Sequence, residues 1–312
     1  MQNRVKPKPL TTYYGGKSGR MAEIIVGEIY HIPHEIYAEL YFGQGAALLT
    51  KPASRIEIAN DLSEGVVNLL RVVRDENLCS RLIQQLELTP YARSEWNRCC
   101  QMYNGTGWQA LTDPVEKARI FYVLLSQSFN GTTTGGGWSF GGVRHNFNVA
   151  KSFYNSLENI KLVAKRLQTV QLECQDALTL LKRWDSPDTL FYLDPPYLWG
   201  TRGQKSKGRQ PYQHEMTDTQ HQELLEACLS AKGKIILSGY YSLVYDLPLV
   251  KAGWTHKAFE ATATSAVFSD RNGLKGRSPA LARRVEYLWF NPASQTQRTL
   301  WLVEGEFENA NH

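Results

Sequence analysis

The chain has 312 residues, of which 42% are hydrophobic and 21% are charged, and its formal net charge is +5. This composition predicts a globular protein, with one large domain that carries an insertion or with two domains, and the mild basic excess suits a polyanionic partner without demanding one. The five cysteines are irregularly spaced and indicate neither a disulfide framework nor a zinc site, and no apolar run reaches the roughly 18 residues that a membrane span needs. We therefore expect a soluble cytoplasmic protein that needs neither a metal nor a membrane.

A glycine-rich turn is the first informative feature. Gly15, Gly16 and Lys17 precede residues 21–29, whose apolar side chains recur at the spacing of a short amphipathic helix. Free amides and the positive end of a helix dipole at such a turn suit a carboxylate or a phosphate, although the spacing is not that of a Walker A loop. Taken alone, this stretch is better explained as a plain entry to a helix.

Two predicted strands follow, over residues 36–42 and 55–59. The first runs into Gly43 and Gly45, which would let the backbone pass close to a ligand; an ordinary tight turn explains them equally well. The second ends near Asp61. An acid at this place is the usual partner of ribose hydroxyls, and the alternative is that Asp61 caps the helix predicted from residue 63.

From residue 77 to about residue 129 the pattern becomes helical and loses the alternation of strand and helix, which indicates an inserted element. The glycine- and threonine-rich run at 131–142 then carries two aromatic residues and ends near Arg144. Such a segment fits a loop that becomes ordered on nucleic acid, with a surface loop of no function as the alternative. We expect a division into residues 1–76, 77–148 and 149–312.

The second half of the chain returns to strands. Residues 151–167 predict one helix that leads back to the main sheet, and residues 170–174 predict a strand that ends before Asp176. Asp176 could equally cap the next helix. A buried strand is predicted at 234–238, and two terminal strands at 257–263 and 285–290 would form an antiparallel edge.

The most specific chemistry lies at residues 189–197. Five residues that favour a strand run into Asp194, Pro195, Pro196 and Tyr197, and because proline cannot donate to a sheet ladder, the strand must end there, at the edge where α/β sheets bind ligands. The Asp194 carboxylate and the Pro195 carbonyl offer two acceptors to one NH2 group, and Tyr197 offers a flat face to a planar ring. Acceptors on both hydrogens would free the lone pair of a nucleobase amine for nucleophilic attack. The alternative is a turn that only ends the strand.

Three blocks in a fixed order, residues 13–17 (YYGGK), 39–45 (ELYFGQG) and 194–197 (DPPY), resemble the Dam-like family of adenine-N6 DNA methyltransferases. The second block departs from many members, which have Pro-Phe where this chain has Leu40 and Tyr41. The resemblance implies an α/β Rossmann-like sheet, mostly parallel with one antiparallel strand, and an inserted, mainly helical target-recognition domain. It also implies S-adenosylmethionine as the cofactor and DNA as the substrate. We further expect a monomer that acts on double-stranded DNA in the nucleoid.

The resemblance and the strand ends together assign the site residues. Tyr13 would pack on the cofactor, Lys17 would reach its methionine carboxylate or a neighbouring backbone group, and Asp176 would contact its adenine ring. The expected cofactor-binding residues are Tyr13, Gly15, Gly16, Lys17, Glu39, Gly43, Gly45, Asp61, Asp176 and Asp194. The expected catalytic residues are Asp194, Pro195, Pro196 and Tyr197. The expected DNA-binding residues, all basic and in loops, are Arg144, Arg202, Lys205, Lys207, Arg209, Arg271, Lys275 and Arg277.

The expected reaction is methyl transfer to the N6 amine of an adenine that is rotated out of the duplex. Transfer to the cytosine amine is the nearest alternative, because the same acceptors serve both bases. An RNA or protein-glutamine methyltransferase, or a non-catalytic DNA-binding regulator on the same scaffold, are the others. No Pro-Cys dipeptide occurs, which argues against the cysteine chemistry used at carbon 5 of cytosine.

Overall fold

The computed structural model of the chain describes residues 6–134, 137–140, 148–198, 214–262 and 283–295. All eight basic residues expected to bind DNA lie outside these ranges. The described ranges nevertheless contain the three blocks that carry the resemblance, so the centre of the molecule can be examined residue by residue.

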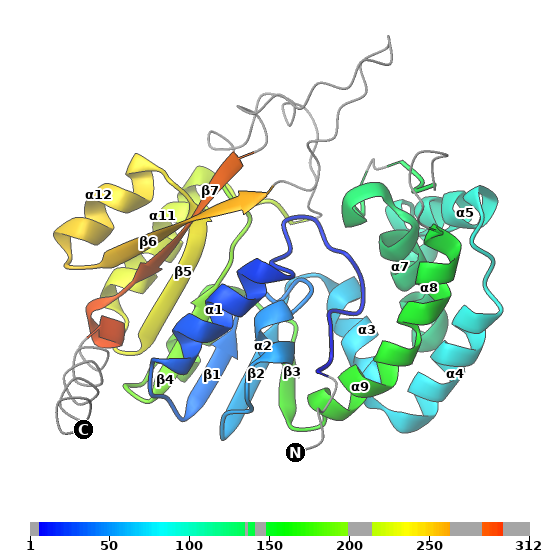
Figure 1. Cartoon of the computed structure of the whole chain (residues 1–312), viewed down its shortest axis with the longest axis horizontal. Helices are drawn as coiled ribbons and strands as arrows, with labels where there is room; N and C mark the ends of the chain where they lie inside the picture. The colour runs from blue at the N-terminus through cyan, green and yellow to red at the C-terminus, as the bar shows by residue number, and fades with distance from the viewer. Residues whose placement is uncertain (1–5, 135–136, 141–147, 199–213, 263–282, 296–312) are drawn as a thin grey trace, which may run out of the picture.

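Within the described ranges, a seven-stranded sheet in the order β3-β2-β1-β4-β5-β7-β6 forms this centre (Figure 1). Its strands are β1 (Ile36–Glu39), β2 (Ile56–Asn60), β3 (Val170–Glu173), β4 (Thr189–Leu193), β5 (Lys234–Tyr240), β6 (Thr255–Thr262) and β7 (Arg283–Phe290). The first five pair in parallel, and β7 pairs antiparallel with both β5 and β6. The expected sheet, mostly parallel with one antiparallel strand, is therefore confirmed.

The strand order reverses between β1 and β4. From β1 the chain proceeds through β2 to β3 on one side, and from β4 it proceeds to β5 on the other. In open α/β sheets the crevice at the carboxyl ends of the strands flanking such a switch point is where ligands bind. Glu39 ends β1 and Asp194 follows β4, so both residues stand at this crevice.

Both faces of the sheet are covered, as the alternation of side chains along β4 requires. Leu190 and Tyr192 join a core beneath α1 (Arg20–Tyr30), α2 (Ala46–Thr50) and α3 (Glu64–Arg74). Phe191 and Leu193 join the opposite core beneath α10 (Ala177–Trp184), α11 (Asp218–Ser230) and α12 (Leu243–Lys251). The fully buried strand β4 is thus held from both sides, which fixes the position of the turn that follows it.

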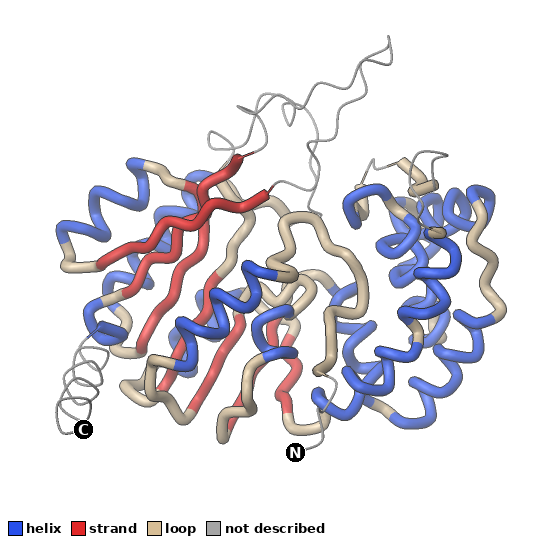
Figure 2. The backbone as a smooth tube through the Cα atoms, in the orientation of Figure 1, coloured by secondary structure: helices blue, strands red, loops and turns tan. Residues whose placement is uncertain are grey.

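The helical region stands beside the β3 edge of the sheet (Figures 1 and 2). It contains α4 (Glu76–Glu87), α5 (Arg93–Asn104), α6 (Gly107–Ala110), α7 (Pro114–Gln127), the short 3-10 helix η1 (Phe129–Gly131), α8 (Val149–Ser156) and α9 (Glu158–Leu167). Its apolar side chains belong to the same buried cluster as those of α1 and α3. This buried cluster continues across residues 76 and 148. The division of the chain at these two positions stays a prediction.

The single helix expected at 151–167 is wrong, because the chain forms α8 and α9 with a break at Leu157. The Ser156 hydroxyl donates a hydrogen bond to the Phe153 carbonyl (2.7 Å), which gives the backbone a local alternative to a continuous helix. At its far end, α9 is tied to the sheet by Arg166. Its guanidinium bonds the buried Glu57 of β2 (2.5 and 2.8 Å) and the Leu48 carbonyl of α2 (2.8 Å).

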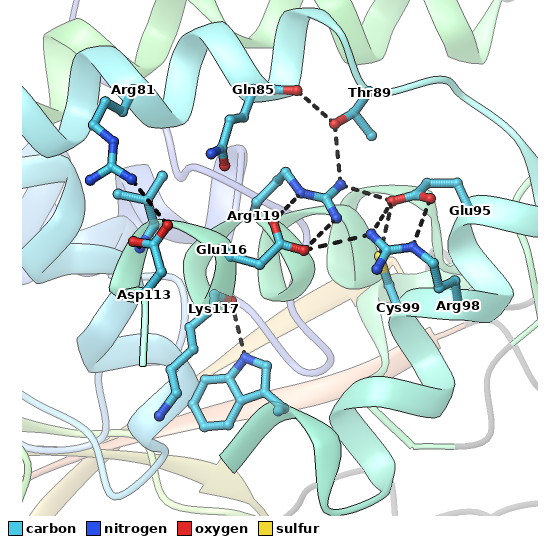
Figure 3. A network of polar contacts seen from close by, with 12 residues as sticks. Arg81, Gln85, Thr89, Glu95, Arg98, Cys99, Asp113, Glu116, Lys117 and Arg119 are labelled. Carbon is cyan, nitrogen blue, oxygen red and sulfur yellow. Dashed lines mark hydrogen bonds and ion pairs between the residues drawn. The ribbon is translucent and has the colours of Figure 1, made fainter. Parts of the chain in front are cut away.

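A network of charged side chains joins the helices of the inserted region (Figure 3). Arg119 of α7 bonds Glu116 (2.7 Å), Glu95 of α5 (2.8 Å) and the Thr89 hydroxyl (3.2 Å). Arg98 contributes a further pair of hydrogen bonds to Glu95 (2.9 and 3.0 Å). Hydrogen bonds from Arg98 and Arg119 lower the pKa of Glu95 to about 2, so the network stays charged at neutral pH.

Arg119→Met is expected to lower the free energy of unfolding by about 2 kcal/mol at pH 7, because the hydrogen bonds of the buried guanidinium to Glu95 and Glu116 are lost and these half-buried carboxylates keep the exposed Arg98 as their cation. The matched control is Arg81→Met, which breaks an exposed pair with Asp113 and should cost less than about 1 kcal/mol. The lowered pKa means that this stabilisation is present above the ordinary pKa of a glutamate and is lost as the pH falls toward 2. Urea denaturation at pH 7 and pH 3 measures both effects, and equal losses for the two variants at pH 7 would contradict the prediction.

Candidate active site

One pocket lies at the carboxyl ends of β3, β2, β1 and β4. The residues that follow each of these strands form its wall, together with the turn around Gly15 and the segment that leads into α11. All ten residues expected to bind the cofactor lie in this wall, namely Tyr13, Gly15, Gly16, Lys17, Glu39, Gly43, Gly45, Asp61, Asp176 and Asp194. Side chains from five separate parts of the sequence therefore converge on one space.

The glycine loop after β1 turns sharply. Gly43 and Gly45 have φ values of 51° and 63°, in the left-handed region that favours glycine. The Gly43 amide donates to Asp61 (2.7 Å) and the Gly45 amide to the Phe42 carbonyl (2.7 Å). A Cβ atom at Gly45 would overlap the Phe42 ring, so a larger residue would push the loop away from its place beside the pocket.

Asp61 is held by two backbone amides. One carboxylate oxygen accepts from Gly43 (2.7 Å) and the other from Ser63 (2.8 Å), while burial raises the Asp61 pKa against the opposing effect of these bonds. The alternative that Asp61 caps the next helix is wrong, because α3 begins at Glu64 with Ser63 at the cap position. Asp61 instead joins the loops after β1 and β2 in a fixed orientation beside the pocket.

Asp176 has both of the properties that the sequence left open. Its carboxylate accepts from the Thr179 amide (3.0 Å) and so caps α10, and it also lies in the wall of the pocket. The two interpretations therefore do not exclude each other. Its assignment to the adenine ring of the cofactor remains a prediction.

Glu39 is the most deeply placed carboxyl group of the pocket, with an exposure of 3%. One of its oxygens accepts from the Leu48 amide (3.0 Å) and from the Tyr37 hydroxyl (3.2 Å). Burial raises the pKa of Glu39 to about 8, and the charge of nearby Asp194 adds to the rise. At neutral pH the group is therefore mostly protonated.

Lys17 points at the turn that follows β4. Its ammonium lies 3.1 Å from both Asp194 oxygens, 2.5 Å from the Tyr197 hydroxyl and 3.2 Å from the Gly15 carbonyl. Burial lowers the Lys17 pKa, but Asp194 and Glu286 raise it by more, so the side chain stays charged. The expected contact with a neighbouring backbone group is present, and the ion pair with Asp194 is a contact that the sequence did not predict.

Glu286 of β7 is a further acidic residue of this site. The Tyr197 hydroxyl lies 2.7 Å from Glu286 and 3.1 Å from Asp194, and since a phenol carries one hydrogen, the shorter contact favours donation to Glu286. The Lys17 ammonium is 3.8 Å from the same carboxylate, which is 6% exposed. One ammonium thus lies between two carboxylates.

The four residues of the proline turn divide between two neighbouring pockets. Asp194 and Pro196 line the pocket described above. Pro195 and Tyr197 line a smaller one, whose wall is mostly apolar and aromatic and is completed by Leu198, His221, Leu237, Ser238, Gly239, Tyr240, Tyr245 and Trp289. The Tyr197 ring meets Tyr240 edge to face, with 4.5 Å between the centroids. The turn therefore stands between two spaces, as a site for two reactants requires.

Asn60 has a structural role that the sequence did not predict. Its side-chain nitrogen donates to the carbonyls of Leu40 and Gln175 (both 3.0 Å), and its oxygen accepts from the Gln175 amide (3.0 Å). These bonds connect the loops after β1 and β3 across the end of β2. An amide residue next to the acid at a strand end was the only signal for this role.

The pocket fits S-adenosylmethionine on the chemistry of its wall. Acids at the ends of β2 and β3 can accept from ribose and adenine, the glycines after β1 permit a close backbone approach, and the carboxylates near Asp194 suit a sulfonium cation.

No cluster of metal-ligating side chains occurs within the described ranges. Among the helices of the described part, none is long and apolar enough to span a membrane.

The sheet order, the glycine loop after β1 and the acid-proline turn after β4 define a Rossmann-like methyltransferase. Residues 13–264 match the family model of the D12 class N6 adenine-specific DNA methyltransferases, and the chain belongs to this family. The resemblance to the Dam-like enzymes is thereby confirmed, and the protein transfers the methyl group of S-adenosylmethionine to the N6 amine of adenine in DNA. The alternatives of a cytosine, RNA or protein substrate and of a non-catalytic regulator are set aside by this membership. No curated protein matched the chain.

Proposed function

We propose that Asp194, Pro195, Pro196 and Tyr197 are the catalytic residues, and that the pocket behind them holds the cofactor along the ends of β3, β2, β1 and β4. The observation that carries this proposal is the convergence of the glycine loop, Asp61 and Asp194 on one pocket. When bound, S-adenosylmethionine supplies an electrophilic methyl group on its sulfonium. The protein contributes two oxygen acceptors and the relative position of the two reactants, and such positioning can supply about 7 to 11 kcal/mol.

The target adenine would enter the smaller pocket beside Tyr197. A base inside a duplex cannot reach the turn, so the nucleotide is rotated out of the stack. The Tyr197 ring would lie on the base, and the Asp194 carboxylate and the Pro195 carbonyl would accept hydrogen bonds from its amine. Lys17 contacts both Asp194 oxygens, but each carboxylate oxygen has a second lone pair, so the amine can bind beside the ammonium, and Glu286 gives the ammonium a second anionic partner.

The proton released by the methylated amine has an acceptor at hand. After transfer, the nitrogen carries a positive charge and must lose one hydrogen to give the neutral product. The Asp194 carboxylate would already accept a hydrogen bond from the amine, and it can take the proton that the nitrogen loses. The Tyr197 hydroxyl lies within hydrogen-bond distance of both Asp194 and Glu286. The chain thereby provides all groups of the reaction centre apart from the cofactor and the DNA.

We further propose that the protein acts on double-stranded DNA as a monomer inside the cell. The net charge of +5 supports a polyanionic partner. The basic residues at 144, 202–209 and 271–277 are proposed as phosphate contacts on the strength of their sequence alone.

Transfer of tritium from methyl-labelled cofactor to duplex DNA, followed by nucleoside analysis, tests the proposed site. N6-methyl-2′-deoxyadenosine is the expected labelled nucleoside, and labelled N4-methyl-2′-deoxycytidine would contradict the assignment of the smaller pocket to adenine. Tyr197→Ala should reduce the rate more than Tyr241→Ala, because Tyr241 is a neighbouring exposed tyrosine outside the walls of both pockets. Equal effects of the two substitutions on the rate would show that Tyr197 does not contact the target base.

Cofactor binding is expected to release a proton at pH 7. Glu39 is mostly protonated there, with a pKa of about 8, and a sulfonium and an ammonium nearby would favour its charged form. Affinity should therefore fall as the pH drops below 8, by up to about tenfold per pH unit. Calorimetric titrations in two buffers of different ionisation heat measure the proton count, and Glu39→Gln should abolish the release. An unchanged proton count in that variant would show that another group titrates.

A further inference from the structure

The side chain of Gln44 presents a hydrogen-bond donor that has no partner in the described part of the protein. Gln44 lies between Gly43 and Gly45 and lines the cofactor pocket, and its Nε2 atom is buried. Buried polar atoms are nearly always satisfied by the protein, by water or by a ligand. A donor that is fixed in the wall of a binding pocket and left without a partner points to a group of the ligand.

Two glycine turns hold this side chain in place. The amides of Gly43 and Gly45 are engaged with Asp61 and Phe42, so the backbone on either side of Gln44 is anchored. A Cβ atom at Gly16 would collide with the Gln44 amide, which means that the side chain packs directly on the turn before α1. Gln44 therefore bridges the two glycine-containing segments of the pocket.

The order of strands indicates which end of the cofactor Gln44 meets. The proposed adenine and ribose contacts, Asp176 and Asp61, follow β3 and β2, and the reacting methyl must face Asp194 after β4. The amino-acid end of the cofactor then falls near β1 and the Gly15 turn, where Gln44 stands. This step rests on the proposed function.

The carboxylate at that end needs donors. Lys17 is the one lysine or arginine among the described residues of the pocket wall, and its three hydrogens are directed at the Gly15 carbonyl, Asp194 and Tyr197. The Gly16 amide is bonded to the Tyr13 carbonyl (3.0 Å). Gln44 is left as the donor with free capacity among these groups.

We propose that the Gln44 side-chain amide donates to the methionine carboxylate of S-adenosylmethionine. It is a cofactor-binding residue of this chain, and it acts alongside Lys17, which is committed to Asp194. The carboxylate would complete the hydrogen bonding of Nε2 and so convert a destabilising buried donor into a specific contact.

Calorimetric binding of two compounds to the full chain tests the proposal. S-adenosylhomocysteine carries the carboxylate, whereas methylthioadenosine ends at the thioether. Gln44→Met, which keeps the size and removes the donor, should weaken S-adenosylhomocysteine about 10-fold, and Gln44→Glu, which adds a repelling charge, about 100-fold. Both variants should bind methylthioadenosine within about twofold of the wild-type protein.

The matched control is Gln175→Met, which alters another glutamine of the pocket wall, at the β3 end, and should affect the two compounds alike. Equal losses for both compounds in Gln44→Met, no loss at all, or tighter binding by Gln44→Glu would overturn the proposal. Tighter binding would mean that the side chain faces the cofactor's ammonium through its oxygen. Wild-type protein that bound neither compound would overturn the cofactor pocket itself.

Discussion

Asp194→Ala is expected to abolish methyl transfer while leaving DNA binding largely intact. The substitution removes the carboxylate that would accept from the adenine amine, and the loss of one preorganised polar group at a reaction centre costs about 10³-fold in rate. The chain should still fold, because Lys17 retains Glu286 as a partner at 3.8 Å and the carbonyl of Gly15 at 3.2 Å. Single-turnover transfer of labelled methyl to DNA measures the rate, and gel retardation measures the binding.

The control for Asp194→Ala lies at the opposite end of the same strand. Asp188 precedes β4, is exposed, and stands far from the proline turn, so Asp188→Ala makes the same change of charge without touching the site. Its rate should stay within about twofold of wild type, as for an exposed substitution away from special features. If Asp194→Ala kept more than a tenth of the wild-type rate, the assignment of the carboxylate as an acceptor for the amine would be wrong.

Lys17→Met is expected to destabilise the protein and to slow the reaction, and a second substitution should repair part of the damage. Removing the ammonium leaves Asp194 and Glu286 close together without a counter-ion, and breaking a buried pair costs about 3–5 kcal/mol. Lys17→Met with Glu286→Gln removes one negative charge together with the positive one. The double variant should therefore be more stable than Lys17→Met alone.

A double-mutant cycle measured by urea denaturation gives the coupling between Lys17 and Glu286. Residues that share a network deviate from additivity by about 0.5–3 kcal/mol, and Glu286→Gln alone should have a small effect because its amide oxygen can still accept from Tyr197. Additive effects in the double variant would show that the two side chains do not interact. The same four proteins, assayed for kcat and for the KM of DNA, separate a loss of positioning from a loss of folding.

The parts of the site that could be predicted are those that depend on local signals. A glycine pair after an apolar strand, an acid at a strand end and a proline turn each report a feature within a few residues, and parallel strands bring their carboxyl ends to one edge of the sheet without further information. Asp61 and Asp194 were placed at one pocket by this rule, and the pocket does contain both.

The contacts that escaped prediction are those made between distant strands or by side-chain rotamers. Glu286 enters the site only because β7 runs antiparallel between β5 and β6, and its register against Tyr240 cannot be read from its own segment. A signal was present, since an acid on the same strand face as the buried Leu288 and Phe290 demands a partner. The Lys17 pairing depends on which of two neighbouring acids its flexible side chain meets.

The attachment of α9 to the sheet has a consequence for exchanging recognition elements between related enzymes. Burial alone would raise the Glu57 pKa, but the hydrogen bonds from Arg166 and Lys51 hold it below its ordinary value, so this buried carboxylate is charged and depends on both partners. A chimera that imported residues 76–167 from a relative without an arginine at the end of α9 would leave Glu57 with Lys51 as its cation and the Ser54 amide as a further donor, a few residues before Asp61. Such a hybrid should fold if an arginine is kept at position 166 of the imported helices, or if Glu57 is replaced at the same time.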